Sequence, residues 1–148
     1  MPGRSGRRAQ RCVVLDARPA SVLAYEAFAD GLDFLSPRER DRLKLAGGEI
    51  LDNIVKHASP ERRCRIHARA ARRGGAILLA FYFRAPGFAA FAGGARPGTE
   101  PAEPLFDPAR RRWRGIGLVM CRNLARKIAY KPGETMDRIF LEFEPRAE

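Results

Sequence analysis

The sequence predicts an α+β fold, a two-layer α/β sandwich in which three helices cover one face of a single mixed, mostly antiparallel sheet. Segments with a helical period cluster between runs of segments with a strand period, in the order β-α-α-β-β-loop-α-β-β. The 148 residues are enough for one compact core and too few to argue for two. We expect residues 1–10, rich in arginine and glycine, to form a mobile tail and residues 11–148 to form the domain.

The first half of the domain is expected to supply one strand and two helices. The β-branched run at residues 12–15 predicts the first strand, and residues 19–31 have apolar side chains along one side of a helix. Ser36-Pro37-Arg38-Glu39 predicts a helix start, because Ser36 can cap the helix and Glu39 can complete a capping box. This second helix should end at about His57, before Ser59-Pro60.

The second half predicts four strands and a long loop. Residues 63–72 alternate small or apolar with basic side chains, which predicts a half-buried strand with His67 on its basic outer face. A turn at Gly74-Gly75 leads to a more buried strand, Ala76–Phe83. Residues 85–114 have no sustained period, and so long a loop in a compact domain is typical of a lid. A helix from Gly115 and strands over 129–131 and 139–143 complete the domain.

Composition narrows the possible partners. The formal net charge of +11 comes mainly from arginine, which favours phosphates or carboxylates as partners. The arginines are scattered and not interleaved with aromatic residues, so nucleic-acid binding is disfavoured. The three cysteines are far apart, which argues against a zinc site and against disulfides. The longest apolar run is too short to span a bilayer and no signal peptide is evident, so we expect a cytoplasmic protein without a membrane partner.

The stretch from Glu49 to Ala58 carries the most specific chemistry. On a helix, Glu49, Asn53, Lys56 and His57 fall on one narrow face, opposite a set of apolar residues. One side can therefore pack on a sheet while the other presents groups that suit phosphate and a divalent metal. An amphipathic helix with a merely hydrated polar side explains the same spacing.

Two glycines mark the predicted start of the third helix. Gly115 and Gly117 allow a ligand to approach the backbone closely, and the first N–H groups of a helix can hold an anion. A tight entry turn also accounts for such glycines.

Four motifs in chain order resemble the conserved boxes of the GHKL (Bergerat-fold) ATP-binding domains. Glu49-x-x-x-Asn53-x-x-Lys56-His57-Ala58 resembles the N box, and Ala85-Pro86-Gly87-Phe88 resembles the end of the G1 box. Pro104-Leu105-Phe106 is similar to part of the ATP lid, and Arg114-Gly115-Ile116-Gly117-Leu118 to the G2 box. The match covers the chain from Arg11 onward and is most similar to the anti-sigma-factor serine/threonine kinases of bacterial partner-switching systems.

The resemblance implies a function and a set of site residues. Asn53 would bind a Mg²⁺ ion that bridges the phosphates of ATP, and an amide oxygen suits that ion. Glu49 would be the general base toward a serine hydroxyl of an anti-anti-sigma protein, or toward water. A sigma factor and a second copy of the chain are the other implied partners. The remaining implied nucleotide contacts are Lys56, His57, Gly87, Arg114, Gly115, Gly117, Leu118 and, near the adenine, Thr135.

One position departs from the family pattern. The G1 box carries an aspartate that accepts a hydrogen bond from the exocyclic amine of adenine, and Phe83 stands there in this chain; Ala85 replaces the first glycine. Loss of a buried charge-assisted hydrogen bond costs on the order of 1.5–3 kcal/mol, or roughly ten- to a hundredfold in affinity. Two main functions therefore stay open: an ATP-binding, anti-sigma-factor-like serine/threonine kinase, and a nucleotide-independent protein-binding module on the same scaffold. A basic nucleic-acid-binding domain is a third, minor alternative.

Overall fold

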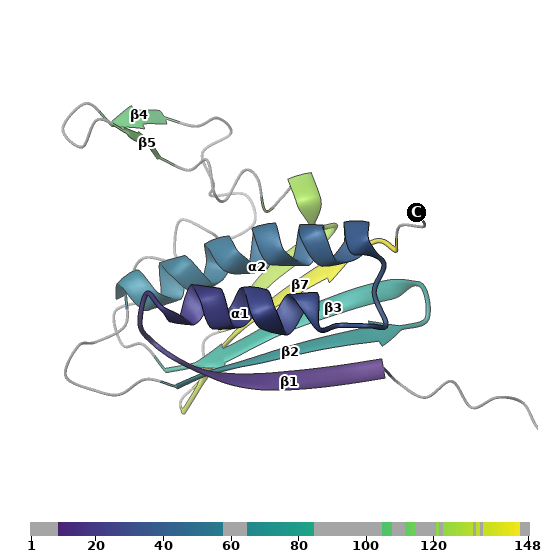
Figure 1. Cartoon of the computed structure of the whole chain (residues 1–148). Coiled ribbons are helices and arrows are strands. Elements are labelled where there is room, and N and C mark those ends of the chain that lie inside the picture. The colour runs from purple at the N-terminus through teal and green to yellow at the C-terminus, as the bar shows by residue number, and fades with distance from the viewer. Residues whose placement is uncertain are drawn as a thin grey trace, which may run out of the picture.

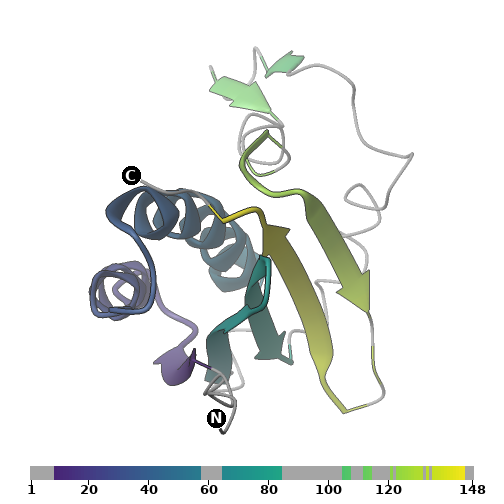
Figure 2. The ribbon, with the colours of Figure 1, turned by 90° about the vertical axis from the view of Figure 1, so that its right-hand side faces the viewer.

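The computed structural model describes residues 9–57, 65–84, 105–107, 112–114, 121, 123–131, 133 and 135–145. A five-stranded sheet in the order β1-β2-β3-β7-β6 is covered on one face by helices α1 and α2 (Figures 1 and 2). The helices span Ser21–Asp30 (α1) and Pro37–His57 (α2). The strands of this sheet are Ala9–Asp16 (β1), Arg65–Arg73 (β2), Ala76–Phe83 (β3), Lys127–Lys131 (β6) and Asp137–Phe143 (β7). The predicted α+β fold is confirmed.

The sheet is antiparallel at every ladder between the described strands. The expectation of a mixed sheet is therefore too broad, because no parallel pair occurs among these strands. The β2–β3 hairpin turns at Gly74-Gly75, as predicted, and Gly74 has a φ of 54° that favours glycine. His67 lies exposed on β2, as expected from the alternation of that strand.

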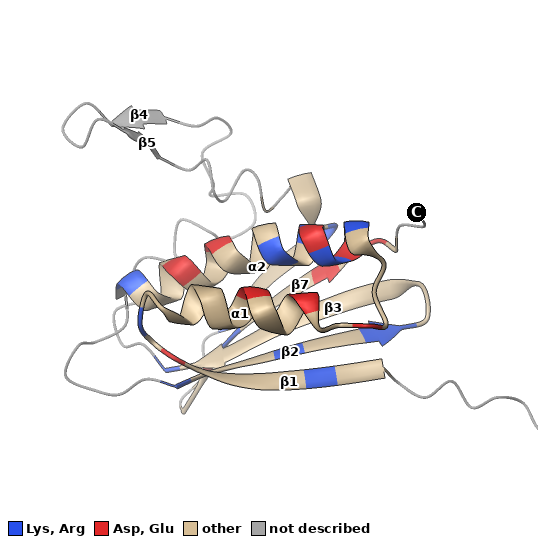
Figure 3. Ribbon diagram, viewed as in Figure 1, with Lys and Arg blue, Asp and Glu red and all other residues tan. Residues whose placement is uncertain are grey.

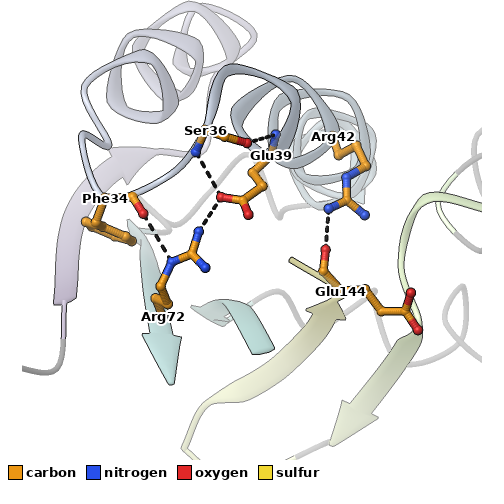
Figure 4. A network of polar contacts seen from close by, with 6 residues as sticks. All are labelled: Phe34, Ser36, Glu39, Arg42, Arg72 and Glu144. Carbon is orange, nitrogen blue, oxygen red and sulfur yellow. Dashed lines mark hydrogen bonds and ion pairs between the residues drawn. The ribbon is translucent and has the colours of Figure 1, made fainter. Parts of the chain in front are cut away.

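Helix α2 begins with the predicted capping box (Figure 4). The Ser36 N–H donates to Glu39 Oε2 at 2.9 Å, and the Glu39 N–H donates to Ser36 Oγ at 3.2 Å. Glu39 is only 4% exposed and is paired with Arg72 of β2, whose Nε–H also donates to the carbonyl of Phe34 at 3.1 Å. The start of α2 is thereby tied to the sheet by a buried ion pair.

The core lies between the two helices and the sheet. Alternate residues of the strands face the helices, so β3 buries Ile77, Leu79, Phe81 and Phe83 while Leu78 and Tyr82 lie on the other face. Helix α2 contributes an apolar stripe of buried residues to the same core: Leu43, Ala46, Ile50, Leu51 and Ile54.

Helix α2 follows the direction of β3. Its first turn is bonded to Arg72, beside the start of β3, and Gly47 lies against Leu79 in the middle of that strand. From Gly47 to Asn53 the helix advances about 9 Å, and from Leu79 to Phe83 the strand advances about 13 Å. The last turns of α2 are therefore level with Phe83 and with the start of β7.

Several boundaries differ from the sequence predictions. Strand β1 begins at Ala9, inside the expected tail. The expected lid contains two short strands, Leu105–Asp107 (β4) and Arg112–Arg114 (β5), which pair with each other in a separate sheet. Of the expected third helix, the structure describes Cys121, Asn123 and Leu124 as helical.

Charged side chains are distributed differently on helix α2 and on strand β2 (Figure 3). Helix α2 carries acidic and basic residues together, whereas β2 carries four arginines and no acidic residue. In the described part of the chain, no helix has the length and apolar character needed to cross a membrane.

Candidate functional site

The second half of α2 presents the predicted polar groups on a surface that remains open to solvent. Glu49 and Asn53 are partly exposed, while Ile50, Leu51 and Ile54 are buried against the sheet. The predicted separation of a polar and an apolar side is confirmed for these residues. Glu49 and Asn53 are one helical turn apart, so their side chains can act on one ligand.

Lys56 has a partner that the sequence analysis missed. Its Nζ lies 2.7 Å from Asp52 Oδ2, one turn earlier on α2, and both side chains are largely solvent-accessible. This ion pair could have been predicted from the spacing of four residues between Asp52 and Lys56 on a helix. An exposed pair of this kind contributes about 0.2–1 kcal/mol, so it does not prevent Lys56 from turning to a multiply charged phosphate.

Cys121 connects the predicted third helix to α2. Its Sγ donates to the carbonyl of Ala46 at 3.4 Å, and the residue is fully buried. Burial and, second, the negative charge of Glu49 raise the pKa of the Cys121 thiol to about 12. The Glu49 carboxylate is therefore close to the residues that follow the predicted glycine-rich helix start. Periodicity marks Cys121 only as a core position and gives no indication of this contact.

Phe83, at the position that corresponds to the G1-box aspartate, is a core residue. Phe83 is 0% exposed and belongs to the main hydrophobic core. It pairs in register with Asp137, the first residue of β7, and Thr135 lies exposed just before that strand. The buried Phe83 ring thus stands at the position where the resemblance to the family implies an aspartate.

Several of the residues singled out in the sequence lie outside the described part of the chain or are described only by their backbone. Gly87, Ala85, Gly115, Gly117 and Leu118 lie outside the described residues. For Arg114, in β5, and His57, the last residue of α2, the structure describes the backbone and not the side chain.

Asn53 is the predicted metal ligand, and its environment fits Mg²⁺. The described residues contain no group of three or more His, Cys, Asp or Glu side chains that could enclose a metal. Mg²⁺ commonly keeps several waters and is held by one or two protein oxygens together with substrate phosphates. The single, partly exposed amide of Asn53 is compatible with that mode of binding.

A hollow of about 530 Å³ lies at the other end of α2. It is lined by Arg38, Asp41, Arg42, residues 123–126 and Glu144. Asp41 precedes Asn53 by about 18 Å along the helix axis, so this hollow is separate from the predicted site. Two of its arginines have partners within the chain. Arg126 Nε lies 3.4 Å from Glu142 Oε2. Arg42 donates a hydrogen bond to the carbonyl of Glu144 (Figure 4).

Comparison of the chain with known protein families agrees with the arrangement of sheet and helices. The sequence model of one family, the histidine kinase-like ATPase domain, matches residues 15–140, from the end of β1 to the middle of β7. No curated protein matches the chain.

Proposed function

Because the chain belongs to the histidine kinase-like ATPase domain family, we propose that it is an ATP-binding serine/threonine protein kinase of the anti-sigma-factor type. Family membership supports the ATP-binding, kinase-like part of this function. The observation that carries the proposal is the partly exposed pair of Glu49 and Asn53, which lie one helical turn apart, with the Glu49 charge close enough to Cys121 to raise the pKa of its thiol. The partner would be a regulatory protein, such as a sigma factor or an anti-anti-sigma protein.

The proposed chemistry assigns separate tasks to the residues of α2. The Asn53 amide oxygen would ligate Mg²⁺, which would neutralise charge on the phosphates. Glu49 would take the proton of the attacking serine hydroxyl, or of water, as the oxygen bonds to the terminal phosphorus and ADP leaves. Lys56 would leave Asp52 to contact a phosphate oxygen.

The alternative is a protein-binding module that binds no nucleotide. The burial of Phe83 favours it, because an apolar ring in the adenine position removes an acceptor and fills space. Glu49 and Asn53 would then be hydrated surface residues, and their removal would affect neither stability nor partner binding.

Calorimetric titration with Mg-ATP and Mg-ADP separates the two functions. Heat of binding that is lost in Asn53→Ala and kept in Glu26→Ala, an exposed carboxylate on α1, supports the kinase. Absence of heat at millimolar nucleotide contradicts it and leaves the binding module.

The catalytic assignment is tested by phosphate release from Mg-ATP. Glu49→Gln should still bind ATP but release phosphate at least about a hundredfold more slowly, the usual contribution of a general base. An unchanged rate would remove Glu49 from this role while leaving nucleotide binding in place.

A further inference from the structure

The sheet has a second face, on which no described helix packs. Helices α1 and α2 cover the opposite face, where the core lies (Figures 1 and 2). Because side chains alternate along each strand, the residues between the core positions point away from the helices. We call this second surface the open face and define it by two neighbouring cross-strand rows, whose aromatic and basic members are His67, Arg69, Tyr82, Lys131, Arg138 and Phe140.

Two aromatic residues lie at the centre of the open face. Tyr82 is on β3, the middle strand of the sheet, and Phe140 is on the neighbouring strand β7. Their ring centroids are 6.1 Å apart, with one ring edge-on to the other. Both side chains are partly exposed, and neither belongs to the hydrophobic core between the sheet and the helices. The two rings therefore keep surface that can stack on a planar ligand.

Basic side chains flank the two rings on both sides. On one side, β2 carries His67 and Arg69. On the other side, β7 and β6 carry Arg138 and Lys131, which pair directly across their ladder. Lys131 Nζ lies 5.7 Å from the centroid of the Phe140 ring. Positive charge and aromatic surface are thus interleaved in the two rows.

The positive charge of the two rows has no acidic counterpart within them. None of the residues that the five strands contribute to these rows is an aspartate or a glutamate. Glu142 lies in the next row, and its Oε2 is 3.4 Å from Nε of Arg126. A polyanion is therefore complementary to the open face, whereas a second copy of the chain would bring the same positive charge against it.

The rings decide which polyanion fits. Every nucleobase has a π-face that stacks on an aromatic side chain, and basic residues around such rings hold the phosphates. Sheets with aromatic residues on their central strands bind single-stranded RNA in this way. A duplex keeps its bases stacked on one another and leaves nothing for the rings to contact. The sequence gives no sign of this surface, because its members come from four strands and meet only through the strand register.

We propose that the open face binds single-stranded nucleic acid, with bases stacked on Tyr82 and Phe140. The phosphates would lie on Arg69 and Arg138 and on Lys131, whose exposed contact with the Phe140 ring is weak enough for a base to replace it. This surface lies across the sheet from α2, so the proposal does not depend on the nucleotide-binding function proposed above.

Fluorescence anisotropy of a labelled oligothymidylate of about 10 nucleotides tests the proposal. The wild type should bind it with a Kd of about 1–100 µM near 0.15 M salt. The double change Tyr82→Leu/Phe140→Leu keeps apolar side chains in the strands and removes both rings. It should weaken binding of the single strand at least about fivefold, with the salt dependence and the binding of a duplex unchanged.

The phosphate contacts are tested by the salt dependence of the same titration. Arg69→Ala and Arg138→Ala should each lower the slope of log Kd against log salt concentration by about 0.7, the value for one phosphate contact of a single strand. Arg38→Ala is the matched control, because it removes one exposed positive charge from the start of α2, in the helical layer. This control should keep the wild-type slope.

Each other result overturns the proposal. Full affinity of the double leucine variant for the single strand would mean that charge alone explains binding. An oligoglutamate peptide that binds as tightly as the oligonucleotide would make the open face a site for acidic proteins. Displacement of the oligonucleotide by Mg-ATP would place it at α2, and absence of binding would leave the proposed kinase untouched. If circular dichroism shows that the double variant is unfolded, Phe140→Leu alone is held to the same criteria.

Discussion

Replacing Gly47 by alanine should destabilise the protein, although glycine is a poor residue for the middle of a helix. The hydroxyl of the buried Tyr25 donates to the carbonyl of Leu43 at 2.6 Å and passes directly over Gly47. A Cβ at Gly47 would lie 2.6 Å from Tyr25 Cζ, closer still to the hydroxyl oxygen, and 2.7 Å from Leu79 Cδ2. Both neighbours are packed in the core, so neither can move aside freely.

The size of the effect follows from three terms. Alanine gains about 1 kcal/mol over glycine in helix propensity. Overpacking a tight core site costs about 1–3 kcal/mol. Displacing the Tyr25 hydroxyl from its acceptor leaves a buried polar group unsatisfied, which costs about 1–3 kcal/mol. We expect Gly47→Ala to lower the free energy of unfolding by about 1–5 kcal/mol.

Gly48 provides the matched control. It is adjacent in the same helix, and a Cβ there would meet nothing within 4 Å. Gly48→Ala should therefore raise the free energy of unfolding by up to about 1 kcal/mol. Urea unfolding followed by circular dichroism measures both variants. If Gly47→Ala is as stable as Gly48→Ala, the close packing of Tyr25 on α2 is wrong; Tyr25→Phe in the Gly47→Ala background should recover part of the loss.

The remaining predictions concern two buried ionisable groups. Arg72→Ala should lower the free energy of unfolding by about 3–5 kcal/mol because it removes the Arg72 guanidinium from the buried Glu39 carboxylate. The double change Arg72→Met/Glu39→Gln should lower it less, and chemical unfolding checks this order. Between pH 7 and pH 10 the wild type should lose roughly 2 kcal/mol more stability than Cys121→Ala, as urea unfolding at both pH values would show. The pKa of the Cys121 thiol is raised to about 12 in the folded state and is about 8.5 when unfolded, so stability falls as the pH rises between these values. Glu49→Gln should lower the pKa of that thiol, because a nearby negative charge is removed; thiolate absorbance in a variant whose other cysteines are serine measures it.

Features that depend on neighbouring residues could be predicted from the sequence. The capping box needs only Ser36 and Glu39, three residues apart, and the hairpin needs only Gly74-Gly75 between two alternating runs. The polar face of α2 follows from the helical period alone. Each of these contacts spans a few residues, so its geometry is fixed by local backbone structure.

Features that depend on distant residues could not be predicted in this way. The contact of Cys121 with Ala46 spans 75 positions, and the pairing of Phe83 with Asp137 is set by the register of β3 and β7. Periodicity shows which face of an element is buried but not which residue lies opposite. The two short strands β4 and β5 were missed because three residues are too few to show a period.

Phe83 changes how the stability of the domain depends on nucleotide. Full burial of a phenylalanine contributes about 1.5–3 kcal/mol without any ligand. In the proposed ATP-binding function, an aspartate at the same place would be a buried charge, and a bound nucleotide at a hundred times its Kd would stabilise the domain by about 2.7 kcal/mol. Burial of the Phe83 ring and binding of a nucleotide would thus stabilise the domain by similar amounts. The ring therefore gives the nucleotide-free domain a stability that bound nucleotide would otherwise provide.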